Sequence, residues 1–140
     1  TVSAYQKPGT TWENITGANI TYTPTSDCNF IIYEYTTIMR YYDAVSNIDF
    51  KLQFGSDINN LGDLTTNNEG YFTSIGPNSG TANFMGPVNF KFLINQSLWS
   101  GEKVIILQAK NNSNATEGVL HYSYDTTAKF FNPFVIIYSV

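Results

Sequence analysis

The last eleven residues, 130–140, are the most apolar stretch of this 140-residue chain and restrict its fold more than any other segment. Six of the last seven residues are β-branched or aromatic, which favours a β-strand. Its two alternating sides are both apolar: Phe134, Ile136, Tyr138 and Val140 on one, Val135 and Ile137 on the other. A strand with one side in water alternates apolar and polar residues instead. We therefore predict a central strand, covered on both sides, with a buried chain terminus.

Two other segments, 29–39 and 103–109, are apolar on both sides in the same way. Residues 48–54 and 88–94 alternate apolar and polar residues, which is typical of strands with one face in water, and Leu93 is the one departure from that alternation. A small sandwich has little interior for three strands of the first kind. We therefore predict that at least one of their faces contacts another subunit.

Shorter strands are predicted near residues 2–6, 18–22, 71–75, 82–85 and 119–124, and a polar loop with at most one helical turn over 57–70. About eight to ten strands without a helix of normal length predict an all-β, antiparallel β-sandwich. A jelly roll is favoured over an immunoglobulin fold, because the loops are wide and the Cys…Trp…Cys pattern is absent. Residues 1–140 are predicted to form a single jelly-roll domain.

The composition points to a surface that is partly an interface. Charged residues make up 13% of the chain, about half of the roughly 25% that is usual, whereas aromatic residues make up 16%. Tyrosine in particular is enriched at protein contacts. The seven Lys and Arg residues are scattered, which disfavours nucleic-acid binding. No apolar stretch is long enough for a membrane helix and no signal peptide is recognised, so no membrane is expected; since the chain begins at Thr1, we expect a processed product or a fragment.

The residues that catalysis would need are scarce. His121 is the only histidine and Cys28 the only cysteine. Ser123 and Asp125 follow His121 closely, but side chains two apart on a strand run parallel and do not form a triad. A structural or interface histidine and a half-buried free thiol are the favoured interpretations. We predict neither an enzyme nor a bound cofactor.

Carboxylates offer two further candidates. Glu34 lies within a largely apolar strand, so its carboxylate needs a partner, and Arg40 and the lysines could supply one. A paired or interface glutamate is favoured over a catalytic one. The segment 57–69 carries Asp and Asn residues in a pattern loosely like a calcium loop. Ile58 and Leu61 interrupt that pattern, so solvated turns are favoured and no metal site is predicted.

Several spaced segments resemble structural proteins of tailed marine phages and large DNA viruses. The likeness begins with GANITYTP at 17–24 and FIIYEY at 30–35. It continues with VNFKF at 88–92, LQAK at 107–110, Leu120-His121 and the apolar end, and so spans Trp12 to Val140. The resemblance implies a virion-surface domain, such as a fibre head or a capsid decoration domain, similar in architecture to the trimeric jelly rolls of the C1q and tumour-necrosis-factor (TNF) type. In that architecture the last strand lies centrally, although this chain has different loops and no collagen stalk.

We therefore expect a virus structural protein on the outer, extracellular virion surface, a homotrimer that contacts other capsid or tail proteins. The candidate subunit-interface residues are Tyr33, Tyr35, Ile105, Leu107, Tyr122, Phe134, Ile136 and Tyr138. The alternative is a carbohydrate- or receptor-binding β-sandwich of the adhesin type, in which Trp12 and Trp99 contact a cell-surface glycan. A glycosidase, the third class considered, would need two carboxylates roughly 5–10 Å apart in one cleft.

Overall fold

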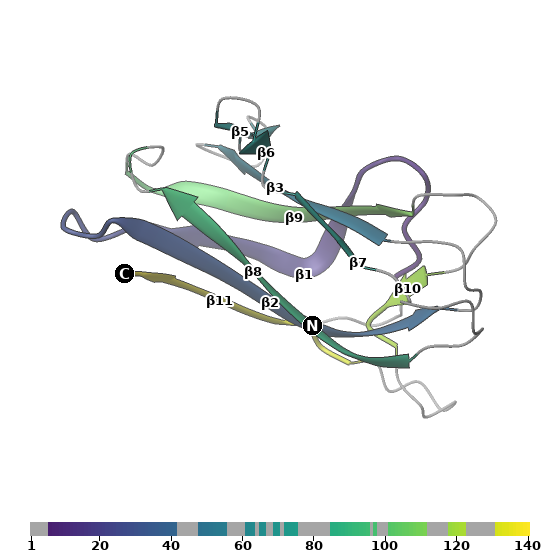
Figure 1. The fold of residues 1–140 in the computed structure, drawn as a ribbon. Helices are drawn as coiled ribbons and strands as arrows, with labels where there is room; N and C mark the ends of the chain where they lie inside the picture. The colour runs from purple at the N-terminus through teal and green to yellow at the C-terminus, as the bar shows by residue number, and fades with distance from the viewer. Residues whose placement is uncertain are drawn as a thin grey trace.

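The protein is an antiparallel β-sandwich, as the alternation of its apolar residues predicts (Figure 1). The structure is a computed structural model that describes residues 6–41, 48–55, 61–63, 65–66, 69–70, 72–75, 85–95, 97, 101–111, 118–122 and 131–140; the side chains of Tyr41 and of 61–75 are outside the description. Eleven strands occur in these residues, and no α-helix does.

The first sheet has the order β1 (Glu13–Tyr22), β9 (Lys103–Asn111), β3 (Ile48–Gly55). Two short strands, β4 (Leu61–Asp63) and β7 (Phe72–Ile75), both pair with β3. The strand β9 is central, as its two apolar sides predict. A separate two-stranded sheet joins β5 (Thr65–Thr66) to β6 (Glu69–Gly70). The prediction of an irregular loop over 57–70 is therefore wrong for β4, β5 and β6.

The second sheet is built around β2 (Phe30–Tyr41). The strand β8 (Met85–Asn95) pairs with β2 along one side, from Phe30 to Arg40. On the other side β2 pairs first with β11 (Phe134–Ser139) and then with β10 (Gly118–Leu120). The sequence predicts separate strands over 82–85 and 88–94, which is wrong from Met85 onward, because β8 continues through Gly86 and Pro87. Of the strand predicted over 2–6, only Gln6 is described, in an isolated bridge to Leu120.

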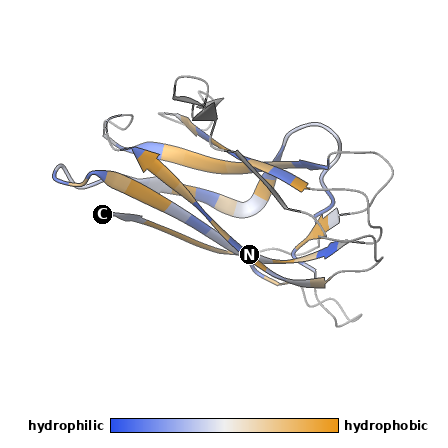
Figure 2. Ribbon diagram, in the orientation of Figure 1, coloured by the Kyte–Doolittle hydropathy of each residue, from blue (hydrophilic) through white to orange (hydrophobic). Residues whose placement is uncertain are grey.

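Apolar side chains from both sheets fill the space between the two layers. Tyr33 and Tyr35 of β2, Phe50 of β3 and Leu107 of β9 are all fully buried. Phe90 of β8 lies against Phe50, with ring centroids 4.7 Å apart and the rings tilted by 46°, a favourable aromatic arrangement. Figure 2 shows hydrophobic residues along most of β9, and both hydrophobic and hydrophilic residues along β2 and β8.

One buried hydrogen bond joins the two layers directly. The Tyr33 hydroxyl of β2 donates to the backbone carbonyl oxygen of Ala18 in β1, at 2.7 Å. That carbonyl lies where β1 departs from regular pairing, because the register with β9 shifts between Asn14 and Asn19. Gly17 supplies the positive φ of 76° that this irregularity uses, which glycine adopts at no steric cost. The tyrosine hydroxyl therefore satisfies a buried backbone group at the irregular part of the strand.

In the part of the chain that the structure describes, the C-terminal strand lies at an edge of its sheet, which contradicts the prediction of a central strand. Among the described residues β11 pairs only with β2, whereas the trimeric jelly rolls named above place the last strand centrally. None of its residues is fully buried, and Val140, at the chain terminus, is 53% exposed. Val135 and Ile137 do pack against the core, but the opposite side of the strand faces outward. The apolar character of that side therefore has a cause other than burial within the sandwich.

Replacing Tyr33 with Phe tests the hydrogen bond between the layers. We expect Tyr33→Phe to lower the free energy of unfolding by about 1–2 kcal/mol, because the Ala18 carbonyl stays buried without this donor. Urea denaturation provides the measurement. The matched control is Tyr22→Phe, which removes a partly buried contact to the Ser139 hydroxyl and is expected to have a smaller effect. An equal effect of the two substitutions would contradict this account.

Candidate interaction surface

The outward side of the second sheet brings together side chains from β11, β2 and β8. The pairing aligns Val140 with Phe30, Tyr138 with Ile32, and Ile32 in turn with Leu93. Side chains at directly paired positions lie on the same face of a sheet. We call this surface the outer apolar face and define it by Phe30, Ile32, Leu93, Phe134, Ile136, Tyr138 and Val140.

This face holds every large hydrophobic side chain that is exposed in the described part of the chain. Phe134 is 58% exposed, Leu93 and Val140 are each 53% exposed, and Phe30 is 40% exposed. Single exposed apolar residues need no explanation, but a contiguous group of them on one sheet face indicates a contact surface. Ile136 and Tyr138 lie between them and are half-buried. The arrangement therefore suits burial against another protein.

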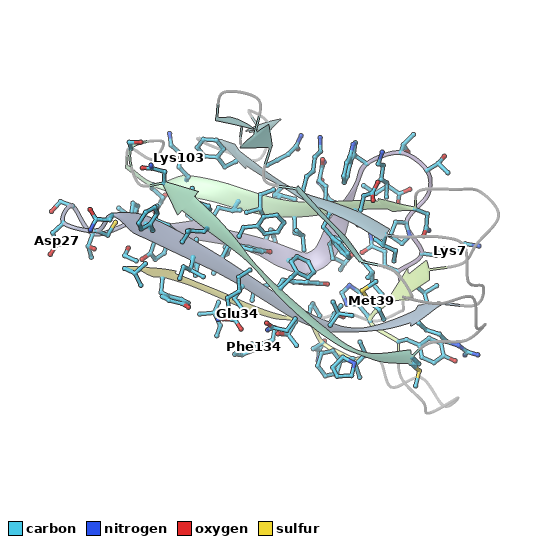
Figure 3. The ribbon with its side chains drawn as sticks, in the orientation of Figure 1. Lys7, Asp27, Glu34, Met39, Lys103 and Phe134 are labelled. Carbon is cyan, nitrogen blue, oxygen red and sulfur yellow. The ribbon has the colours of Figure 1, made fainter. Side chains whose placement is uncertain are left out.

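A polar row crosses the outer apolar face beside Ile136. Glu34 of β2 lies 3.0 Å from the Lys91 ammonium and accepts a hydrogen bond of 2.8 Å from the Asn89 side chain. These hydrogen bonds from Asn89 and Lys91 lower the pKa of the Glu34 carboxyl, and the same contact raises the pKa of Lys91. The sequence prediction that Glu34 has a cationic partner is confirmed. Figure 3 shows Glu34 and Phe134 projecting from the same side of the sheet, away from the first sheet.

Four of the predicted subunit-interface residues lie in the core and not at the surface. Tyr33, Tyr35 and Leu107 have no exposed area, and Ile105 is 1% exposed. Their surroundings are other residues of the same chain, so they have no surface to offer a partner. The prediction is wrong for these four, because a doubly apolar strand does not reveal which side faces its own core. The other four residues are at least partly accessible.

Tyr122, one of those four, lies away from the outer apolar face as defined. Its hydroxyl accepts a hydrogen bond from the Arg40 guanidinium, which also lies over the ring at 4.7 Å from the centroid. Its backbone N–H donates to the Ile38 carbonyl, next to β10. Phe134, Ile136 and Tyr138 all lie on the outer apolar face. Three of the predicted subunit-interface residues thus belong to the outer apolar face, whereas Phe30 and Val140 of that face were not among the predicted ones.

Trp12 lies on the opposite side of the molecule, over the outward face of the first sheet. Its ring is half-buried, and the ammonium groups of Lys51 and Lys110 lie 4.8 and 4.9 Å from its centroid. Such distances are typical of cation–π contacts. Lys110 also lies 3.7 Å from the buried carboxylate of Asp49. Trp99, the second predicted glycan-contacting residue, lies outside the described residues.

His121 is buried directly after β10 and adopts a positive φ of 61°. Its Nδ1 atom shares a hydrogen bond of 3.1 Å with the Thr37 hydroxyl, and Nε2 has no hydrogen-bond partner among the described residues. Burial lowers the pKa of the imidazole to about 4, because the charged form loses its hydration. This geometry matches the favoured interpretation of a structural histidine. Ser123 and Asp125 lie outside the described residues.

The remaining sequence candidates add no further site. Cys28 is a half-buried free thiol, as predicted. Of the segment 57–69, residues 57–60 lie outside the described residues, as do the side chains of the rest, so the calcium pattern is not described. The described residues contain no cluster of three or more His, Cys, Asp or Glu that could hold a metal ion, and no helix long and apolar enough to cross a membrane. A shallow surface hollow of about 290 Å³ lies at the irregular part of β1, lined by Ile15, Ile106 and short polar residues.

Comparison with protein-family models, with curated proteins and with solved structures found no match for the chain. The function of the chain is therefore inferred from its surface. Leu93 carried a usable sequence signal, since it is the apolar residue that breaks the alternation of 88–94 and it is 53% exposed. Phe30 carried no such signal, because an apolar residue at the start of a strand fits either side.

Acid titration tests the environment of His121. The His121 imidazole takes up a proton near pH 6.5 in the unfolded chain but only near pH 4 in the folded chain. Lowering the pH between these values therefore favours unfolding. Stability from this group is fully present above about pH 6.5 and is lost towards pH 4, by at most about 3 kcal/mol. We expect His121→Asn to reduce the acid dependence of the free energy of unfolding over this range, measured by urea denaturation.

Asn is chosen because it tolerates a positive φ better than most residues do. The carboxylates titrate in both proteins, so the difference between the two pH profiles isolates the histidine. Parallel profiles for the wild type and His121→Asn would show that the imidazole titrates normally in the folded protein.

Proposed function

We propose that this chain is a virus structural protein, a β-sandwich of the outer virion surface that assembles with other protein subunits. The observation that carries the assembly role is the outer apolar face, where all the exposed large hydrophobic residues of the described chain gather. The virion location is motivated by the sequence resemblance to structural proteins of phages and large DNA viruses. A capsid decoration or fibre-head domain, with C1q/TNF-like trimers as the predicted association, is the form that this resemblance implies.

The low charge of the chain supports an assembly role. Charged residues are 13% of the sequence, and on the outer apolar face the Glu34 carboxylate and the Lys91 ammonium neutralise each other as a pair. A neutral, hydrogen-bonded pair is less costly to bury in an interface than an isolated charge. The face therefore combines apolar area with little net charge, which suits protein contact.

Lysine substitutions on this face test the assembly role. We expect the wild-type protein to form oligomers at micromolar concentration, measured by light scattering after size-exclusion chromatography. The double variant Phe134→Lys with Val140→Lys is expected to be largely monomeric, because two added charges per chain would be buried without partners. Its free energy of unfolding is expected to change by less than about 1 kcal/mol, since both side chains are exposed.

The matched control carries the same added charge on the first sheet, at the exposed positions Asn19 and Thr21 of β1. Asn19→Lys with Thr21→Lys is expected to leave the oligomer intact. A wild-type protein that is monomeric at 100 micromolar (about 10⁻⁴ M, a concentration at which even weak contacts associate) would contradict the assembly role. The virion location has a separate test: antibodies to the domain should label the outside of intact particles in immunogold electron microscopy.

A second candidate function is carbohydrate or receptor binding by an adhesin-type module, favoured by the position of Trp12. The ring is partly accessible on a polar sheet face that also presents Lys51 and Lys110. Apolar surface with a few placed polar groups is the usual composition of a small-ligand site. The two functions are compatible, because Trp12 contacts Lys51 and Lys110 of the first sheet, whereas the outer apolar face belongs to the second sheet.

A glycan array tests this second candidate. We expect binding of a subset of glycans by the wild type, lost by at least about tenfold in Trp12→Ala and largely kept in Trp12→Phe, which retains an aromatic face. Asp27→Ala is the surface control, since it changes an exposed residue in the turn between β1 and β2. Absence of any glycan signal for the wild type would remove this candidate without affecting the assembly role.

A further inference from the structure

The free edges of the two sheets differ in how they are protected against pairing with another strand. Natural edge strands carry prolines, lysines or bulges that discourage such pairing. The strand β8, at one edge of the second sheet, contains Pro87 and Lys91. The strand β1, at an edge of the first sheet, contains the register shift between Asn14 and Asn19. The strand β11, at the other edge of the second sheet, has the sequence FVIIYS, without charge, proline or bulge.

The pairing with β2 fixes which backbone groups of β11 are free. Val140 and Phe30 exchange backbone hydrogen bonds in both directions, at 2.9 and 3.0 Å. In an antiparallel pair such residues alternate with residues whose N–H and C=O groups point away from the partner strand. Val135, Ile137 and Ser139 are the latter kind. Their backbone groups therefore face the free edge, where no described strand pairs with them.

The same alternation explains the position of Pro87 on the opposite edge. Pro87 is aligned with Ile38, whose carbonyl bonds to the Tyr122 N–H on the side of β10 and β11. The proline nitrogen therefore faces away from β2, where it removes a donor only from the free edge of β8. Within β11 itself, residues 134–139, no proline occupies such a position, and Pro133 stands directly before the strand.

A second copy of β11 fits this edge in one register that uses the whole strand. If two copies run antiparallel around a two-fold axis at Ile137, the Ile137 residues of both chains pair with each other and Val135 pairs with Ser139. About six new backbone hydrogen bonds result. On the outward side, Phe134 then lies opposite Val140 of the second copy, and Ile136 opposite Tyr138.

This register accounts for the exposure pattern of the strand. Phe134 and Val140, at 58% and 53%, are its most exposed large hydrophobic residues and lie at opposite ends. Two-fold pairing places Phe134 of each chain opposite Val140 of the other, so that these side chains bury apolar surface against each other. No charged residue of β11 meets its own copy at the axis, since the strand has none. The outer apolar face becomes continuous across the two chains.

We infer that two copies of this chain associate through their β11 edges, in antiparallel register centred on Ile137, to form one continuous sheet across a two-fold axis. The inference builds on the proposed assembly role and specifies its partner as a second copy of the chain. It predicts an even-numbered assembly unit, whereas the sequence resemblance predicts a trimer. A strand from a different protein on the same edge would be the competing outcome.

Disulfide cross-linking tests the register. In a Cys28→Ser background, Ile136→Cys with Tyr138→Cys places each new thiol opposite the other in the second copy, at a pair about 4.5 Å apart between Cα atoms, within the range of a disulfide. The two thiols within one chain are about 7 Å apart and point the same way, which disfavours an intrachain bond. We expect most of the oxidised protein to run as a covalent dimer on a non-reducing gel, with the 136–138 linkage identified by mass spectrometry.

The matched control is Leu93→Cys with Asn95→Cys in the same background. These positions have the same spacing and are also exposed on the same sheet face, but they belong to β8. We expect this protein to remain monomeric on the gel. Equal cross-linking of the two variants, or none for the β11 variant, would overturn the inference.

A proline substitution provides a second, independent test. Val135→Pro reproduces on β11 what Pro87 provides on β8, because it removes an N–H that faces only the free edge. The dimer dissociation constant is expected to rise by about tenfold or more, since two intermolecular hydrogen bonds are lost per dimer. Val135→Ala keeps the N–H and is expected to retain the dimer. Circular dichroism at matched concentration verifies that both variants stay folded.

The outcomes separate this inference from the function on which it rests. A wild-type protein that is monomeric at all concentrations would overturn both the assembly role and the edge pairing. A wild-type oligomer that survives Val135→Pro and yields no 136–138 linkage would leave the assembly role standing and overturn the pairing alone.

Discussion

The hydrogen-bonded pairing of β2 is the constraint on which the second sheet depends. This strand is paired with β8 along one side and with β11 and β10 along the other. Strand pairing fixes the side to which every residue points. Because Phe30, Ile32 and Glu34 point outward, the alternating residues Tyr33 and Tyr35 point into the core. A shift of β2 by one residue would bury the Glu34 carboxylate and expose two tyrosines. The apolar side chains of the core and the Tyr33–Ala18 hydrogen bond are therefore needed for a single register.

The two layers serve different purposes. The first sheet presents mainly polar groups outward, among them Lys51, Lys110 and the half-buried Trp12. The second sheet presents the outer apolar face, with the Glu34–Lys91 pair across it. Burying the first face would cost the desolvation of lysines, whereas burying the second removes apolar area from water. This contrast is why we assign the assembly contact to the second sheet and a glycan contact, as the alternative, to the first.

Protection of edges connects the sheet topology with the proposed assembly. A protein that was selected only to remain monomeric would be expected to protect each exposed edge, as Pro87 and Lys91 do on β8. The strand β11 is instead uncharged and regular, and its outward side is as apolar as a core strand. His121, by contrast, is buried within the chain: its Nδ1 atom contacts the Thr37 hydroxyl, and its Nε2 atom has no hydrogen-bond partner among the described residues.

The sequence predicts most of the described strands and most of the inward-facing residues, such as Phe50, Leu52 and Ile94. It could do so because the two-residue alternation of a strand is a local property that the core makes visible. Which doubly apolar strands are central depends on how the whole chain folds. The strands β9 and β11 have similar local patterns, yet among the described strands β9 has two neighbours and β11 has β2 alone. An apolar strand side that is covered by the chain's own core has the same composition as one that is covered by a partner. The pairing register of β2 with β11 was therefore needed to place Tyr33 and Tyr35 in the core and Phe134 and Ile136 on the outer face.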